Sequence, residues 1–177
     1  ILNIKHIYLV GCGSSLYSTF YGAQFFRKLR CFHTTQCWDA AEVTSVIFPP
    51  TDTGLLAVSQ SGETRDTHRS ILLAQQHKIF TLSIVNQIGS LIDQTTHSSL
   101  YLRVGRENAV ASTKSFTAQV MTLALLAIWI TQQRPIDNII MENSRILFRE
   151  VRYLPMLIED ALTLECQCMT IASKLIS

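Results

Sequence analysis

Short apolar runs alternate with longer amphipathic segments along most of this chain. Five runs rich in apolar and β-branched residues are each short enough to be a strand, and apolar positions at helical spacing lie between them. The predicted strands cover residues 7–10, 34–38, 55–59, 79–85 and 100–104. Such alternation predicts βα units that form a parallel sheet with helices on both faces.

Two of these runs are nearly continuous in their apolar character, which is typical of strands buried on both faces. They lie at 6–10 and 54–58 and are expected at the centre of the sheet. Crossover helices are predicted at 15–29 and 64–76, with a weaker helix that starts at Asp39 or Ala40 and ends before Pro49. We therefore expect a three-layer αβα sandwich with a five-stranded parallel sheet. The pattern itself leaves the strand order open, and the flavodoxin-like order is the doubly wound order that we consider here.

The character of the sequence changes after Arg134. No strand pattern follows, and one or two amphipathic helices are predicted, interrupted or begun near Pro155. This divides the chain into a sheet domain at 1–134 and a helical segment at 135–177. The most apolar stretch, 118–130, is shorter than the ~20 residues that span a bilayer, so we expect a buried core helix and no membrane partner.

Composition narrows the class of protein further. A chain of 177 residues that is 47% hydrophobic can bury one full-sized core. Its net charge of +2 comes from scattered Lys and Arg side chains, which gives no basic stripe for nucleic acid. The five cysteines form no CxxC pair and no zinc-like Cys/His cluster, so we expect free thiols in a reducing, cytoplasmic compartment and no metal site.

The loop after the third predicted strand carries the clearest chemistry. It contains Ser59, Gln60, Ser61, Gly62, Glu63 and Thr64, and it leads into a helix whose first N–H groups are free to bind an anion. No lysine follows the glycine as in a nucleotide P-loop, so a phosphomonoester fits better than a triphosphate. An ordinary Ser/Thr helix cap uses the same residue types and remains the alternative.

A second hydroxyl-rich loop, Gly11-Cys12-Gly13-Ser14-Ser15, follows the first predicted strand. In a flavodoxin-like sheet the first and third strands are neighbours, so both loops are expected to face one crevice and share a ligand. The rival hypothesis is a dinucleotide site, because Gly11 and Gly13 match the start of G-x-G-x-x-G. Leu16 stands where the third glycine belongs, so that fingerprint is broken.

A third segment, residues 107–114, precedes the long apolar helix. Ser112 or Thr113 could cap this helix, and Lys114 could supply positive charge to a phosphate. The candidates for acid–base chemistry are Glu63, Glu107, His68 and Lys114, and their positions in the sequence pair none of them. We therefore assign no catalytic residue and expect no cofactor.

Three motifs then occur in the order found in a known family. Residues 59–64 followed by Asp66-Thr67 match SQSGET-x-DT, residues 110–114 match VASTK, and residues 12–15 match CGTS with serine for threonine. From about residue 5 to 133 the chain resembles the sugar isomerase (SIS) domain, and most closely the first SIS half of the glutamine-fructose-6-phosphate aminotransferases. Ala109 departs from this pattern by replacing the usual glycine, and Asn108 replaces an aliphatic residue.

The resemblance implies a site for fructose 6-phosphate. The implied substrate-binding residues are Ser15, Ser59, Gln60, Ser61, Thr64, Val110 and Ser112. It also implies the hexose-phosphate-binding half of an enzyme that makes glucosamine 6-phosphate without metal or redox cofactor. The glutaminase domain and the second SIS domain would then be partners elsewhere in the parent chain, the isolated chain would be inactive, and a homodimer is expected. A phosphosugar-sensing SIS module of a regulator, and a stand-alone phosphosugar isomerase, remain the alternatives.

Overall fold

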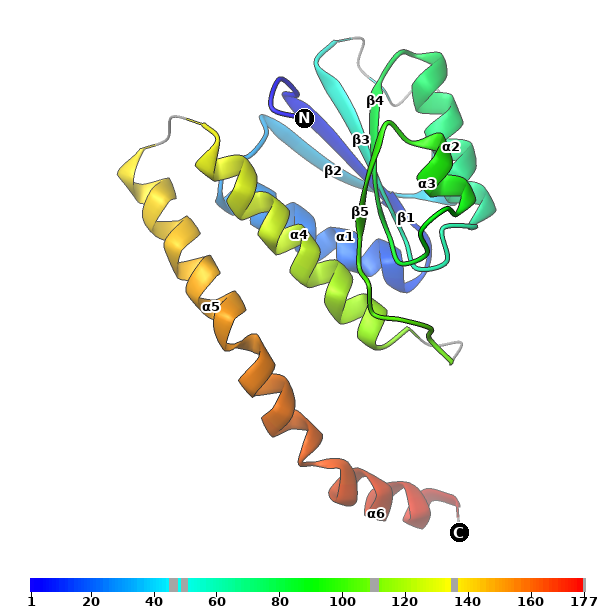
Figure 1. Ribbon diagram of the computed structural model, residues 1–177, viewed down its shortest axis with the longest axis vertical. Coiled ribbons are helices and arrows are strands. Elements are labelled where there is room, and N and C mark those ends of the chain that lie inside the picture. Colours follow the sequence, from blue (N-terminus) through cyan, green and yellow to red (C-terminus); the bar gives the residue numbers. More distant parts are fainter. Residues whose placement is uncertain (45–47, 49–50, 109–111, 135–136, 177) are drawn as a thin grey trace.

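The computed structural model of the protein describes residues 1–44, 48, 51–108, 112–134 and 137–176. Its centre is one sheet of five parallel strands in the order β2-β1-β3-β4-β5, covered by helices on both faces (Figure 1). The strands are β1 (His6–Gly11), β2 (Thr34–Asp39), β3 (Thr53–Ser59), β4 (Phe80–Val85) and β5 (Ser98–Tyr101). The three-layer architecture and the flavodoxin-like order are therefore confirmed.

The central strand β3 is buried at every position, as its continuous apolar run predicts. Successive side chains of a strand point to opposite faces of the sheet. Leu56 and Val58 accordingly join the core cluster on one face, whereas Leu55 and Ala57 join the cluster on the other. The side chains of β3 thus pack against both helical layers, and this packing holds the end of β3 in a defined position.

The helices divide between the two faces. One face carries α1 (Ser14–Lys28) and α4 (Lys114–Gln132), and the other carries α2 (Arg65–Gln76), the five-residue α3 (Leu91–Thr95) and a 3₁₀ turn, η1 (Ala40–Glu42). The helices α1 and α4 pack closely because Gly22 has no side chain: a Cβ there would lie 2.9 Å from the Leu123 methyl groups. This contact sets the register between the two helices.

Among the described residues, α4 is the helix long and apolar enough by length and composition to cross a membrane. Half of its most apolar stretch is buried inside the protein, however. Its buried residues pack against α1 and belong to the same core cluster as residues of β1 and β3. It therefore serves as the core helix that the sequence predicts.

Several predicted boundaries were wrong. The fifth strand ends at Tyr101 rather than extending to 104, because its partner β4 ends at Val85 and Arg103 turns the chain with a φ of 54°. Of the helix predicted from 39 or 40 to before Pro49, the described residues form η1, which begins where the Asp39 side chain accepts from the Ala41 N–H and ends at Glu42; residues 45–47 fall outside the described residues. The short α3 was not predicted at all.

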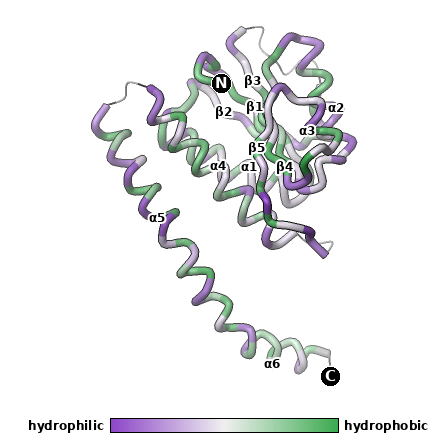
Figure 2. Tube along the Cα trace, viewed as in Figure 1, coloured by the Kyte–Doolittle hydropathy of each residue, from purple (hydrophilic) through white to green (hydrophobic). Residues whose placement is uncertain are grey.

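The chain leaves the sheet domain as α5 (Asn138–Leu162) and α6 (Glu165–Ile176). Within α5 only Ile140 and Ser144 are buried, and α5 contacts α4. Contrary to expectation, the helix continues through Pro155 and breaks instead at Thr163 and Leu164. Apolar and polar residues alternate along both helices (Figure 2), and the described side chains of α6 are exposed.

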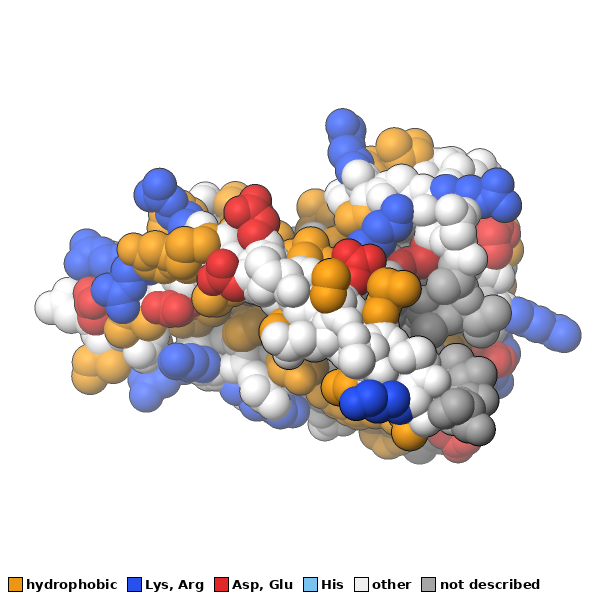
Figure 3. All heavy atoms as spheres, turned by 90° about the horizontal axis from the view of Figure 1, so that it is seen from below, with side chains coloured by type: hydrophobic (Ala, Val, Ile, Leu, Met, Phe, Trp, Pro, Cys, Tyr) orange, Lys and Arg blue, Asp and Glu red, His pale blue; other side chains and the backbone are white. Residues whose placement is uncertain are grey.

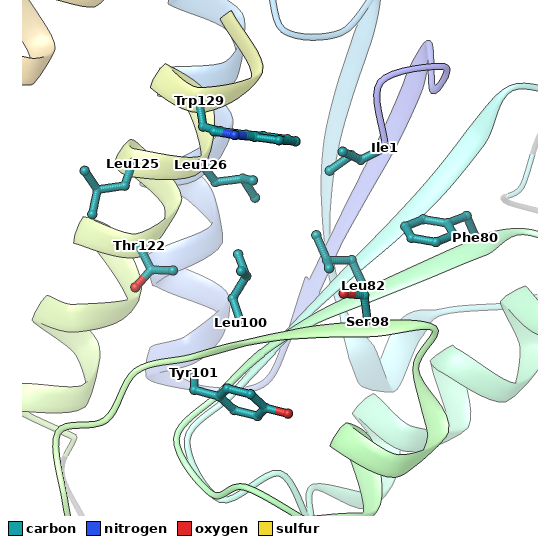
Figure 4. A pocket seen from close by; sticks show the side chains of 10 residues that line it. All are labelled: Ile1, Phe80, Leu82, Ser98, Leu100, Tyr101, Thr122, Leu125, Leu126 and Trp129. Carbon is teal, nitrogen blue, oxygen red and sulfur yellow. The ribbon is translucent and has the colours of Figure 1, made fainter. Parts of the chain in front are cut away.

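An apolar cavity of about 670 Å³ lies between α4 and the edge of the sheet at β4 and β5. The side chains of Leu100, Leu126 and Trp129 are among those that line it (Figure 4). It is open to solvent in part, since Trp129 is 44% exposed. None of the residues of the two hydroxyl-rich loops lines this cavity, so it is separate from the candidate site described next.

Candidate functional site

The two hydroxyl-rich loops meet at the carboxyl edge of the sheet. β1 and β3 are neighbouring parallel strands, with Val10 opposite Ala57, so their last residues end side by side. Adjacent strands lie about 4.8 Å apart, which brings the loop after β1 close to the loop after β3. The helices that follow, α1 and α2, both begin at this edge and direct their positive dipole ends toward it.

The loop after β3 is organised by its own serines. Ser59, which is 2% exposed, accepts from the Gly62 N–H at 3.0 Å, and its hydroxyl lies 3.1 Å from the Thr64 hydroxyl. The exposed Ser61 accepts from the Glu63 N–H at 3.1 Å. Thr64 is the N-cap residue of α2, but its side chain makes no capping bond. The loop is therefore curled back on itself, and plain helix capping does not account for Thr64.

Gly62 is required at the tip of this loop for two reasons. Its φ of 70° lies in the left-handed region, which residues that carry a Cβ rarely adopt. A Cβ at this position would also come within 2.5 Å of Ser90 Cβ and closer still to Ser90 Oγ. Ser90 is 3% exposed, so it has little room to move away.

The segment after β4 supports the loop after β3 (residues 59–64) from the side. The Ile92 N–H donates to the Gly62 carbonyl at 2.9 Å, and the Leu91 N–H donates to Glu63 Oε1 at the same distance. The Asn86 side chain accepts a hydrogen bond from the Val104 N–H and donates one to the Gly105 carbonyl. These two bonds hold the chain after β5 against the end of β4. Leu91 and Ile92 therefore hold the loop after β3 in place, and Asn86 holds the chain after β5.

The loop after β1 is shaped by two glycines. Gly13 has a φ of 56° and is the N-cap residue of α1, while a Cβ on Gly11 would lie 2.9 Å from the Ser15 carbonyl carbon. The bare Gly11 therefore lets the first turn of α1 approach the end of β1. Ser15, which is 7% exposed, receives a hydrogen bond at Oγ from Gln119 Nε2 at 3.0 Å.

The third segment is held by one carboxylate. Glu107 accepts from the Thr113 hydroxyl at 2.7 Å, from the Thr113 N–H at 3.0 Å, and from the hydroxyl of Ser115. Bonds from Ser115 and Thr113 lower the pKa of Glu107 to about 2, since they stabilise the ionised form. Ser112 Oγ lies 2.6 Å from Ser115 Oγ, which places Ser112 at the start of α4 within the same network.

The predicted site residues are only partly brought together by the described structure. Ser15, Ser59, Gln60, Ser61 and Thr64 lie on the two adjoining loops, and Ser112 lies at the start of α4. Val110, and Ala109 with its departure from the family pattern, fall outside the described residues.

The candidate acid–base residues are not arranged as a pair by any hydrogen bond or ion pair among the described residues. His68 Nε2 lies 3.2 Å from the Thr95 hydroxyl, on the α2–α3 side, and Lys114 is exposed. Within the described part of the chain, no group of three or more His, Cys, Asp or Glu side chains could hold a metal ion. On the face seen from below in Figure 3, Lys and Arg side chains are scattered rather than gathered into one patch.

Three residues of the site were not predicted. Gln119 lies five residues into the long apolar helix, where helical periodicity alone gives it no role. Ser90, the N-cap residue of the unpredicted helix α3, lies against Gly62. Glu107 was considered for acid–base chemistry, whereas its contacts make it the cap of α4. A carboxylate followed by hydroxyl residues just before a helix was the available signal for capping.

Comparison with known proteins finds named relatives that cover most of this chain. A curated relative from Acanthamoeba polyphaga mimivirus, named "Probable glutamine-fructose-6-phosphate aminotransferase (isomerizing)", is 37% identical over 167 residues, which are 88% of this chain and 28% of that protein. A glutamine-fructose-6-phosphate aminotransferase (isomerizing) of Thermus thermophilus is 34% identical over 161 residues, which are 90% of this chain and 26% of that enzyme. The chain thus spans about a quarter of the length of these relatives.

Structure and family comparison lead to the same assignment. The C-terminal domain of glucosamine-fructose-6-phosphate aminotransferase from Francisella tularensis superposes with a TM-score of 0.80 at 24% identity, covering 96% of this chain and 48% of that one. At that identity the superposition establishes the fold. The profile of the SIS domain matches residues 1–129, and the resemblance to the aminotransferases is confirmed by the named relatives. The chain therefore belongs to the SIS domain family.

Proposed function

We propose that the crevice at the ends of β1 and β3 binds a hexose phosphate, with fructose 6-phosphate and glucosamine 6-phosphate as the preferred ligands. The observation that carries this proposal is the pair of adjoining hydroxyl-rich loops, each at the start of a helix. Two helix N-termini and neutral hydroxyl donors suit a phosphomonoester with sugar hydroxyl groups attached. Ser15, Ser59, Gln60, Ser61 and Thr64 are the proposed ligand-binding residues, together with Val110 and Ser112.

We further propose that the chain is the first SIS half of the isomerase part of a glucosamine-6-phosphate synthase. The names of its relatives support this role over that of a sensing module, and its coverage of about a quarter of their length leaves room for a second SIS domain and a glutaminase domain. We expect the isolated chain to bind ligand without completing the reaction. The five cysteines, all described and all unpaired, support a cytoplasmic location.

The proposed division at residue 134 is supported by the way α5 and α6 leave the sheet domain. Their exposed apolar side chains, which include Tyr153, Met156 and Leu157, are suited to packing against a further domain or a second subunit. We therefore propose residues 135–177 as a helical connector and a homodimer as the assembly.

The test is calorimetric titration of the purified chain with fructose 6-phosphate, glucosamine 6-phosphate and AMP. The variant Ser59→Ala/Ser61→Ala should weaken hexose-phosphate binding by at least about tenfold, since it removes two hydroxyl donors. Ser144→Ala, which changes a buried serine of α5 outside the loops, is the matched control and should bind like wild type. Preferential binding of AMP would support the nucleotide alternative, and absence of hexose-phosphate binding at millimolar ligand would count against the proposal.

A further inference from the structure

A fully buried glutamine, Gln119, faces the first turn of α1 from the core helix α4. It is 0% exposed, and its Nε2 donates to Ser15 Oγ at 3.0 Å. Its Oε1 has no hydrogen-bond partner among the described residues. Burying an amide whose acceptor is unused costs free energy, so an apolar side chain would serve the core better. Its presence is therefore better explained by what it does to Ser15.

The position of Ser15 is fixed independently of this bond. The first turn of α1 rests on Gly11, where a Cβ would lie 2.9 Å from the Ser15 carbonyl carbon. The Ser15 carbonyl also accepts from Ser18 Oγ at 2.7 Å. The bond from Gln119 is thus not needed to place the Ser15 backbone, and what it adds is an orientation for the hydroxyl.

A serine hydroxyl carries one proton and two lone pairs. Because the Ser15 oxygen accepts from Gln119, its own proton is directed elsewhere. Among the described residues, no acceptor for that proton is found. Ser15 lies in the loop that adjoins the Ser59 loop at the end of neighbouring strands, so a ligand oxygen in the crevice is the natural acceptor.

Gln119 is itself held in register from both sides along α4. One turn before it, Ser115 is bound to Glu107 and lies 2.6 Å from Ser112 at the oxygens. One turn after it, Leu123 packs against the bare Gly22 of α1. Residues four apart lie on the same face of a helix, so these contacts present the Gln119 amide to α1 with little freedom.

We propose that Gln119 is a positioning residue that orients the Ser15 hydroxyl as a donor to an oxygen of the bound hexose phosphate. This inference rests on the proposed function, because it assigns a role within that same site. It adds a specific residue from the core of the domain to the recognition of the ligand.

The test is a double-mutant cycle on the purified chain, with fructose 6-phosphate affinity measured by calorimetry. The variants are Gln119→Met, Ser15→Ala and the pair together. Methionine has nearly the length of glutamine and no N–H donor. The matched control is Thr131→Val, which removes a buried polar group of α4 about 18 Å further along the helix. The melting temperature of each variant is measured in parallel.

We expect Gln119→Met to weaken binding by about 3- to 10-fold, the loss of one well-oriented hydrogen bond, with little change in melting temperature. In the Ser15→Ala background the same change should have no further effect, and Thr131→Val should bind like wild type. Unchanged or tighter binding by Gln119→Met would show that Ser15 does not depend on it and would overturn the inference. An equal loss with and without Ser15 would overturn it too, because Gln119 would then act by another route. If the wild-type chain binds no hexose phosphate at all, the proposed function fails and this inference fails with it.

Discussion

Replacing Gly62 by alanine should destabilise the protein through the contact between the loop after β3 and Ser90, the N-cap residue of α3. Two effects add at this position. A left-handed backbone costs a residue with a side chain about 1–2 kcal/mol. The new Cβ must also displace Ser90, whose Cβ would be only 2.5 Å away, and such overpacking typically costs about 1–3 kcal/mol. We expect a loss of about 3 kcal/mol in the free energy of unfolding, which for a domain of this size is about 6–12 °C in melting temperature.

A matched control exists within the same region. Gly89 has a φ of 77°, yet a Cβ on it would meet nothing within 4 Å. Gly89→Ala therefore carries only the backbone cost of about 1–2 kcal/mol. Thermal unfolding followed by circular dichroism should place Gly62→Ala below Gly89→Ala by about 2–8 °C.

The steric part of the loss can be isolated with Ser90→Gly, which removes both atoms that the new Cβ would meet. In that background Gly62→Ala should cost no more than Gly89→Ala does in the wild type. If Gly62→Ala melts at the same temperature as Gly89→Ala, or if its cost is the same with and without the Ser90 side chain, the close contact does not govern stability and the reasoning is refuted.

Two further outcomes follow from the loops and the C-terminal helices. Glu107→Gln should lower the melting temperature at pH 7, because the ionised carboxylate holds the start of α4. The lowered pKa of Glu107 means that this contribution is fully present above about pH 4.5 and is lost as the pH falls through about 2. The melting temperatures of the wild type and of Glu107→Gln should therefore converge near pH 2. A wild-type advantage that persists at pH 2 would contradict this. Deleting residues 163–177 should leave the melting temperature unchanged, because the described side chains of this segment are exposed, and should reduce self-association in sedimentation at high concentration; a clear loss of stability would show that α6 packs on the domain.

The sheet could be predicted from the sequence because its signals are local and agree with one another. Continuous apolar runs identified β1 and β3 as central, and Gly13 and Gly62 indicated that a loop follows each of these strands. These local signals did not fix the order of the strands, which the fold shows to be flavodoxin-like. Where local signals were weak, the prediction failed: β5 was extended past Tyr101 because apolar residues continue, whereas its partner strand had already ended at Val85.

The candidate site was predicted at the level of loops but not of contacts. The sequence shows that Ser59 and Ser15 follow strands, yet the approach of Ser90 to Gly62 and of Gln119 to Ser15 joins residues 28 and 104 positions apart. No periodicity or turn signal reports such a distance. A buried polar residue in an apolar helix is visible in the sequence, but its partner is only visible in the fold.

The same contacts explain why this domain is better suited to holding a ligand than to moving its protons. Acid–base chemistry near neutral pH needs a titratable group whose pKa lies close to that range and which is free to reach the substrate. Glu63 is engaged by the Leu91 N–H, and Glu107 is ionised down to about pH 2 by the donors around it. The carboxylates of the loops thus hold the backbone in place, and the hydroxyls of Ser59, Ser61 and Thr64 are the groups that we propose to contact the ligand. If the crevice binds a hexose phosphate as proposed, we expect the groups that act on its carbonyl carbon and hydroxyls to be other than Glu63 and Glu107.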